Sequence, residues 1–255
     1  MKGSLKRNLE IISELTVADF KGKYKNSVLG FFWSFLNPLL MFLVLYVVFT
    51  FFIKIKVEHY QLYLLLGIIL WTFFSEATIA GTESIVRKRG LITKIAIMPE
   101  TLVISATLNA VLTFFLNFLI YLVFLAVFRV SLSWEVLYFP VIFGQLFFLI
   151  LGINFFLSAL FVRYQDISHI WQVLLQVWFW LTPIVYPPER IPPSFLKYYM
   201  LNPLARLIHS SRTVILYHYL TSLRDLVITV IVTILFFAIG LWFFKKEKNF
   251  FPERV

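Results

Sequence analysis

The 255-residue chain contains no cysteine. This absence excludes disulfides, thiol catalysis and cysteine-ligated metal sites, and it leaves the redox compartment open. Charge is also scarce: Asp, Glu, Lys and Arg make up 14% of the residues, whereas hydrophobic residues make up 60% and the mean hydropathy is +0.86. A long helix at the surface of a water-soluble protein needs a polar face. The composition therefore indicates a membrane protein with short loops.

Motifs for nucleotide binding and catalysis are missing as well. The nearest fragment to a P-loop, Gly22-Lys23, is followed by Tyr24 instead of Ser or Thr, so the chain is not expected to bind ATP by that route. It has no His-Glu-x-x-His and no Gly-x-Ser-x-Gly. The four histidines fall at or beyond the ends of the apolar stretches: His59, His169, His209 and His218. We expect no cofactor and no metal in this chain, and we do not expect an enzyme.

Long apolar stretches dominate instead. At ~1.5 Å rise per residue, about 20 helical residues cross the ~30 Å hydrocarbon core of a bilayer. We predict an all-α membrane protein, a single domain over residues 1–255, with six transmembrane helices at about 28–53, 60–82, 102–128, 137–161, 168–186 and 225–244.

The basic residues predict an orientation. With six spans both termini lie on one side of the membrane, and that side holds fifteen Lys and Arg residues against eight on the other. The positive-inside rule then places both termini in the cytoplasm, for a protein of the inner (plasma) membrane. The net charge of +10 is interpreted as a topology signal, with attraction to membrane lipids second, and no nucleic-acid partner is expected. Residues 1–25 carry charges throughout, so we expect no cleaved signal peptide there.

Three segments between the spans have patterns of their own. Segment 4–24 has apolar residues at three- and four-residue spacing, which predicts an amphipathic helix at the cytoplasmic interface that either anchors the first span or docks a partner. Segment 87–98 contains about two helical turns between the helix breakers Gly90 and Pro99, which predicts a short cytoplasmic helix that either is gripped by a soluble partner or packs on its own bundle. The proline-interrupted segment 187–222 predicts re-entrant helices that cap the outer face.

Glu76 is the one carboxylate well inside a predicted span. A charged side chain there costs roughly 2.5–3.5 kcal/mol, so it should face the bundle interior or be protonated. Glu76 acts either as a proton relay or as a hydrogen-bonded structural carboxyl. The spans contain no basic partner for it, and we favour the structural role.

Aromatic residues are abundant: 30 Phe, 12 Tyr and 7 Trp. Most are expected to face lipid or neighbouring helices, and Tyr and Trp collect at span ends. A minority would line a conduit, because flat apolar faces alternating with polar Asn, Gln and Thr suit the C–H faces and hydroxyls of a sugar chain.

Three stretches carry more specific residues. The first reads LTVADFKGKYKNSVLGFFWSFLNPL at 15–39. The second reads GIILWTFF at 67–74 and continues through LITK at 91–94 to Met98-Pro99. The third reads RYQDI at 163–167, LTPIVY at 181–186 and LNPL at 201–204, followed by Arg212. Together they resemble the membrane subunits of ABC-2-type exporters, especially those of polysaccharide, O-antigen and teichoic-acid export. Residues that depart from the usual family pattern are Ala18, Lys23 and Gln165 in place of Arg and Met98 in place of Phe.

The resemblance implies one half of an exporter. A homodimer of this chain would form the pathway, and two copies of a cytoplasmic P-loop ATPase would bind ATP and Mg²⁺ and drive transport of a lipid-linked polysaccharide of the O-antigen type. The residues expected to couple to the ATPase are Arg87, Lys88, Arg89, Leu91, Ile92, Lys94 and Ile95. The residues expected to contact the substrate headgroup are Lys21, Lys23, Tyr24 and Lys25. The candidate pathway-lining residues are Trp33, Tyr46, Trp71, Phe74, Trp178 and Trp180.

Three alternatives stay open. The same fold would serve for export of teichoic acid, capsule, a drug or a lipid. A membrane enzyme acting on lipid-linked sugars would need paired carboxylates or metal ligands near one interface. A proton-driven carrier would depend on Glu76.

Overall fold

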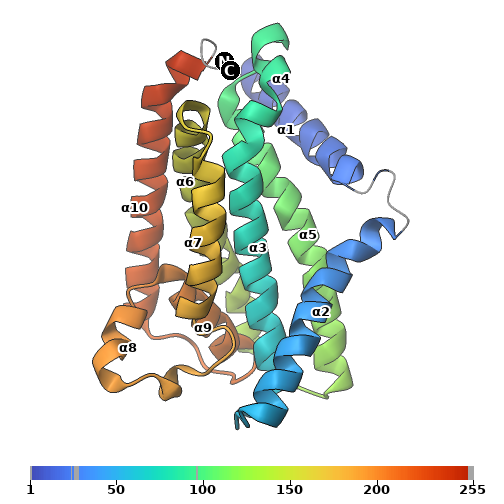
Figure 1. Cartoon of the computed structure of the whole chain (residues 1–255), viewed down its shortest axis with the longest axis vertical. Helices are drawn as coiled ribbons and strands as arrows, with labels where there is room; N and C mark the ends of the chain where they lie inside the picture. The colour runs from blue at the N-terminus through green and yellow to red at the C-terminus, as the bar shows by residue number, and fades with distance from the viewer. Residues whose placement is uncertain (1, 24, 26–28, 96, 252–255) are drawn as a thin grey trace.

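The computed structural model describes residues 2–23, 25, 29–95 and 97–251, and within these ranges it leaves out the side chains of 2–5, 31, 93–95 and 196–198. The described part is all-helical and contains no strand (Figure 1). This confirms the all-α class. The helices are α1 (Lys2–Lys23), α2 (Trp33–Val47), α3 (Tyr60–Arg87), α4 (Arg89–Ile95), α5 (Pro99–Val127), α6 (Phe139–Arg163), α7 (Ile167–Leu181), α8 (Pro193–Tyr199), α9 (Pro203–Ile215) and α10 (Leu223–Glu247).

Five helical segments of the described chain are long and apolar enough to cross a membrane: Trp33–Phe52, Tyr60–Arg87, Pro99–Val127, Trp134–Arg163 and Leu223–Phe250. The first of them continues α2 with a π-helical turn, Val48–Phe52. The protein is therefore a multi-pass membrane protein. α1 begins and α10 ends at the end of the molecule that also holds α4, whereas α8 and α9 lie at the opposite end (Figure 1).

The fifth expected span, 168–186, differs from the others. Its place is taken by α7, which has 15 residues and ends at Leu181, so its length is about 22 Å instead of the ~30 Å of a full crossing. The helix stops there because Pro183 lacks an N–H and disfavours helical backbone at the preceding residue, and Thr182 is extended (φ −107°, ψ 137°). The six-span count stays a prediction.

α3 is the central helix of the bundle. In its most apolar window 78% of the residues are buried, compared with 6% in α2 and 17% in α10. α3 packs against α5, α6, α7 and α9, whereas α10 packs mainly on α6, and α1 packs on α5. A helix that is apolar on all sides must be covered by protein or by lipid, and α3 is covered mainly by the neighbouring helices.

Two close helix contacts depend on glycine. Gly240 of α10 faces Gly152 of α6 so closely that a Cβ at Gly240 would lie 2.0 Å from the carbonyl oxygen of Gly152. Gly81 of α3 makes room for Asn154 of α6, whose buried Nδ2 donates to the carbonyl of Ala77 (3.1 Å) and to Thr107 Oγ1 (2.8 Å). Small residues of this kind let transmembrane helices approach and form hydrogen bonds inside the bundle.

The loop after α7 is held by the buried side chain of Arg212 in α9. Its Nε donates to the carbonyl of Tyr63 (3.1 Å), Nη1 to that of Pro183 (2.6 Å) and Nη2 to that of Ile184 (2.7 Å). The guanidinium also lies over the Tyr63 ring, 3.4 Å from its centre. Gly67 leaves room for it, since a Cβ there would lie 2.3 Å from Nη2. Arg212 thereby ties the α7–α8 loop and α9 to α3.

Candidate functional site

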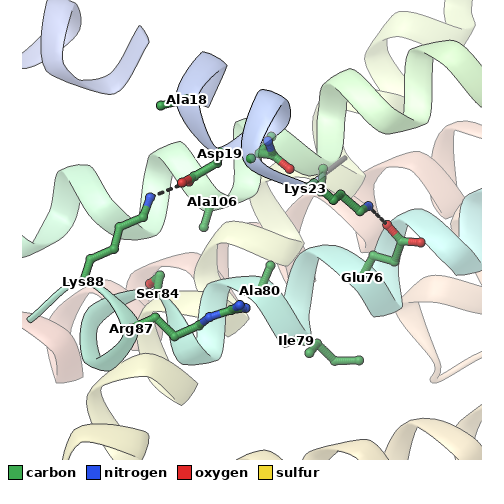
Figure 2. Close-up of a pocket in the computed structure, with 13 residues that line it drawn as sticks. Ala18, Asp19, Lys23, Glu76, Ile79, Ala80, Ser84, Arg87, Lys88 and Ala106 are labelled. Atoms are coloured by element: carbon green, nitrogen blue, oxygen red, sulfur yellow. Dashed lines mark hydrogen bonds and ion pairs between the residues drawn. The ribbon is translucent and has the colours of Figure 1, made fainter. Parts of the chain in front are cut away.

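A charged cavity lies between α1, α3 and α5, at the end of the bundle that holds α4. Its volume is about 580 Å³. Small side chains on α3 and α5, such as Ala80, Ala106 and Ala110, leave the space open, and charged side chains from α1 and α3 project around it (Figure 2). The lining residues that carry polar groups are Asp19, Lys23, Glu76, Ser84, Arg87, Lys88 and Asn109.

Two ion pairs cross this cavity from α1. Lys23 Nζ lies 2.9 Å from Glu76 Oε2 on α3, and both side chains are partly exposed, Lys23 at 40% and Glu76 at 35%. Lys88, at the junction of α3 and α4, pairs with Asp19, and these two side chains are 19% and 31% exposed. Figure 2 shows the two pairs side by side in the cavity. The end of α1 therefore brings one cation and one carboxylate to the start of α4 and the adjacent half of α3.

Neutral hydrogen bonds hold α1 in place independently of the ion pairs. Asn109 Nδ2 of α5 donates to the carbonyl of Thr16 (3.2 Å), and Thr16 Oγ1 lies 3.5 Å from the carbonyl of Ser105. Thr16 is buried against α5. The position of α1 beside the cavity thus has a polar and packing basis besides the charges.

Of the predicted headgroup residues that the structure describes, one lines the cavity and two do not. Lys23 lines the cavity and pairs with Glu76, whereas Lys21 and Lys25 are exposed and do not line it. Tyr24 lies outside the described residues. Sequence reasoning singled out Glu76 but missed Asp19. It found no basic partner for Glu76 within the spans, and the partner, Lys23, comes from α1, outside them.

The predicted coupling residues surround the short helix α4. Arg87 and Lys88 line the cavity, and Arg87 lies 3.5 Å from Glu83. Arg89 is exposed, Leu91 is half-buried, and Ile92 is buried in an apolar cluster with Phe251 near the end of the described chain. The side chains of Lys94 and Ile95 lie outside the described part.

A second concave feature, a groove of about 740 Å³, runs between α2, α3 and α7. Its lining is mostly apolar, with aliphatic side chains from α2, aromatic side chains from α3 and α7, and a few polar ones. Trp71 of α3 meets Phe179 of α7 edge-on with ring centres 5.5 Å apart, and Trp180 is 56% exposed. The polar side chains in the groove are Asn37, Ser75, Gln172 and Gln176.

Of the predicted pathway residues, Trp71 and Trp180 line this groove. Phe74 is fully buried and packs against Trp178, with ring centres 5.4 Å apart. Tyr46 stacks on Phe42 and Tyr60, and Trp33 is half exposed at the start of α2.

The structure adds groove residues that the sequence analysis did not single out. Gln172 and Gln176 of α7 are one helical turn apart and both exposed, on an otherwise apolar helix. That i, i+4 spacing was the signal in the sequence that would have identified them. Among the described residues, no three His, Asp or Glu side chains come together as a metal site would require.

Comparison with known proteins adds relatives of stated function. Residues 11–216 match the family model "ABC-2 type transporter". The chain is 30% identical over 261 residues to an O-antigen export system permease protein RfbA of Klebsiella pneumoniae, covering 99% of this chain and 98% of that protein. It is 27% identical to the protein of the same name from Myxococcus xanthus, with 96% and 95% covered. A polysialic acid transport protein KpsM of Escherichia coli is 22% identical, with 92% and 93% covered.

Proposed function

The chain belongs to the ABC-2 type transporter family, and from this premise we propose that it is the permease subunit that exports a lipid-linked polysaccharide of the O-antigen type. The relatives that are O-antigen export permeases match nearly the whole chain. A transmembrane permease for polysaccharide export, without an enzymatic activity of its own, is the function these relatives support. A separate ATPase partner follows from membership of the family.

We propose that α7 makes the fifth of six crossings, with the loop that follows it completing the distance to the outer face. α1, α4 and the end of α10 would then lie in the cytoplasm, as the excess of basic residues on that side favours, in the inner membrane. α8 and α9 would form the re-entrant cap. Two copies of the ATPase would bind ATP and Mg²⁺ and grip α4 and the exposed Arg87 and Arg89 beside it.

The observation that carries the transport proposal is the groove between α2, α3 and α7. The exposed ring of Trp180 suits the C–H face of a sugar, the buried rings of Trp71 and Phe179 form the floor beneath it, and the amide side chains suit sugar hydroxyls. The groove of a single chain is open along one side and cannot enclose a polysaccharide. We propose that a second copy of the chain closes it, so that the homodimer forms the conduit. The charged cavity on the cytoplasmic side would receive the phosphates of the lipid carrier through Lys23 and its neighbours.

The groove gives a first testable prediction. Changing both Gln172 and Gln176 to Leu should lower export of the polysaccharide by about tenfold, because each amide–hydroxyl hydrogen bond contributes about 0.5–1.5 kcal/mol. Export is measured as surface polysaccharide in cells producing equal amounts of each variant. Val177→Leu, on an exposed part of α7 outside the groove, is the control and should export normally. Normal export by the double variant would show that the groove is not part of the export pathway.

Glu76 gives a second prediction, which separates this function from a proton-driven carrier. Glu76→Gln should keep most of its export activity, because the amide can still hydrogen-bond with Lys23 and no proton needs to pass. A carrier that depends on Glu76 as a relay would lose all transport. The measurement is ATP-driven export in proteoliposomes with and without an imposed pH gradient.

A further inference from the structure

We propose that Asp19 and Glu76 are selectivity residues, which keep ordinary phospholipids out of the charged cavity while a lipid-linked diphosphate enters. The inference rests on the proposed function and adds to it a discrimination step. In the empty cavity each lysine is neutralised by a carboxylate, and the diphosphate takes the place of both carboxylates when it binds.

The first step is the balance of charge in the cavity. The pairs Lys23–Glu76 and Lys88–Asp19 place two cations and two carboxylates around one space (Figure 2). Arg87, the remaining charged group of the lining, is largely exposed and lies near Glu83. A cavity whose lysines stood alone would attract any phosphate in the membrane. The carboxylates cancel that general attraction.

The second step is that these pairs are exchangeable. Lys23 and Glu76 are each more than a third exposed, and ion pairs at such sites contribute only about 0–1 kcal/mol. Lys88 and Asp19, at 19% and 31%, are partly exposed, and theirs is the harder of the two pairs to open. A phospholipid with one phosphate diester offers a lysine no more charge than the carboxylate it would displace. A diphosphate offers two phosphate groups in one molecule. Glu76 on α3 and Lys88 at the end of that helix are 12 residues apart, about 18 Å. Exchange therefore requires the long side chains of Lys23 and Lys88 to leave their carboxylates and converge on the two phosphates. The diphosphate therefore displaces the carboxylates, and the single phosphate does not.

The third step is that exchange leaves the cavity intact. α1 stays attached to α5 by the hydrogen bond from Asn109 to the carbonyl of Thr16 and by the burial of Thr16, neither of which involves charge. The small side chains of Ala80, Ala106 and Ala110 leave room for the incoming group. Opening both ion pairs thus changes the charge presented to the ligand but leaves α1 packed on α5.

The exchange also reaches the ATPase-facing side of the molecule. Lys88 lies between α3 and α4, so a diphosphate that takes Lys88 from Asp19 acts directly at the start of α4. Binding of the correct substrate thus changes the contacts of Lys88 at the start of α4, the helix through which the ATPase is proposed to act.

The test is binding of an isoprenyl diphosphate to the full chain in nanodiscs of zwitterionic lipid. The chain is used without its ATPase, so that no P-loop competes for the diphosphate. Lys23→Gln and Lys88→Gln should each weaken binding by about tenfold, through loss of one charge-assisted contact. Asp19→Asn and Glu76→Gln should instead strengthen it several-fold. Glu10→Gln, in the exposed Lys6–Glu10 pair on the same helix, is the matched control and should have no effect.

Selectivity is tested by adding phosphatidylglycerol to the nanodiscs. The wild-type chain should keep its affinity for the diphosphate, whereas Asp19→Asn and Glu76→Gln should lose several-fold, since a lysine that faces a neutral amide is no longer neutralised and attracts phosphatidylglycerol. Thermal unfolding of each variant shows whether it is folded. The proposal is overturned if the carboxylate variants weaken binding as the lysine variants do. It is also overturned if inorganic pyrophosphate binds more tightly than the isoprenyl diphosphate, which would assign the site to a soluble anion.

Export of polysaccharide by the wild-type chain with its ATPase is measured in parallel. Export without diphosphate binding at this cavity contradicts the selectivity proposal alone. Diphosphate binding with the expected variant pattern, but no export, contradicts the proposed function.

Discussion

Replacing Arg212 with methionine is expected to abolish export and to lower the melting temperature of the protein by about 10 °C or more. The side chain is 1% exposed and donates three hydrogen bonds to main-chain carbonyls. A hydrogen bond from a charged donor contributes about 1.5–3 kcal/mol, and a buried carbonyl left without a donor adds its own cost. The loss is thus a large part of the 5–15 kcal/mol that stabilises a typical domain.

The position of these carbonyls makes the effect functional as well as structural. Two of them, Pro183 and Ile184, belong to the loop after α7, and Tyr60 donates to the next one, at Val185 (2.8 Å). Irregular backbone inside a membrane protein persists only where such partners satisfy it. α7 forms one wall of the groove, so release of this loop displaces Trp180 and the amide side chains of α7.

Two further variants separate the role of Arg212 from its charge. Arg212→Lys keeps the charge but cannot present the three-donor fork of a guanidinium, and it should fail almost as severely. Arg224→Gln removes an exposed arginine at the start of α10 and should melt as the wild type does. Melting is followed by size-exclusion chromatography of the heated, detergent-solubilised protein. Normal stability of Arg212→Met would show that the buried guanidinium does not hold the loop.

Gly240→Ala is expected to separate α10 from α6 and to eliminate export. The added Cβ would lie 2.0 Å from the carbonyl oxygen of Gly152, and main-chain atoms of a helix cannot move aside as a flexible side chain does. Most of the contact surface of α10 is on α6, so the whole helix must shift. Overpacking of a tight contact typically costs 1–3 kcal/mol or more.

Gly144→Ala is the matched control for this substitution. Gly144 is also a helical glycine, in α6, but a Cβ there meets nothing within 4 Å. Alanine is preferred over glycine in a helix by about 1 kcal/mol, so this variant should be as stable as the wild type or slightly more so. Equal melting temperatures and equal export for the two variants would contradict the close contact of α6 and α10.

Much of the fold is predictable from the sequence because a bilayer imposes a length on each apolar helix. Four of the long helices, α3, α5, α6 and α10, lie where the apolar runs predict them. α7 illustrates the limit: its sequence is apolar to residue 188, but Pro183 ends the helix early. Apolar composition alone does not distinguish a helical residue from a packed loop residue.

The candidate site is less predictable, because its parts are distant in sequence. Lys23 and Glu76 are 53 positions apart, and Lys88 and Asp19 are 69 apart. The basic residues are visible as clusters, yet their carboxylate partners become apparent only when the fold brings the end of α1 to the cavity that α3 and α5 line. Aromatic residues pose the same problem, since Phe74 in the core and Trp180 in the groove both lie in aromatic-rich stretches, and the sequence alone does not say which ring is exposed.

The most direct test of the proposed half-transporter is to purify the tagged chain gently from its native membrane and identify what accompanies it. A P-loop ATPase at one-to-one stoichiometry is the predicted result. A chain that repeatedly purifies alone, and that transports its substrate or transfers sugars without any partner, would contradict it.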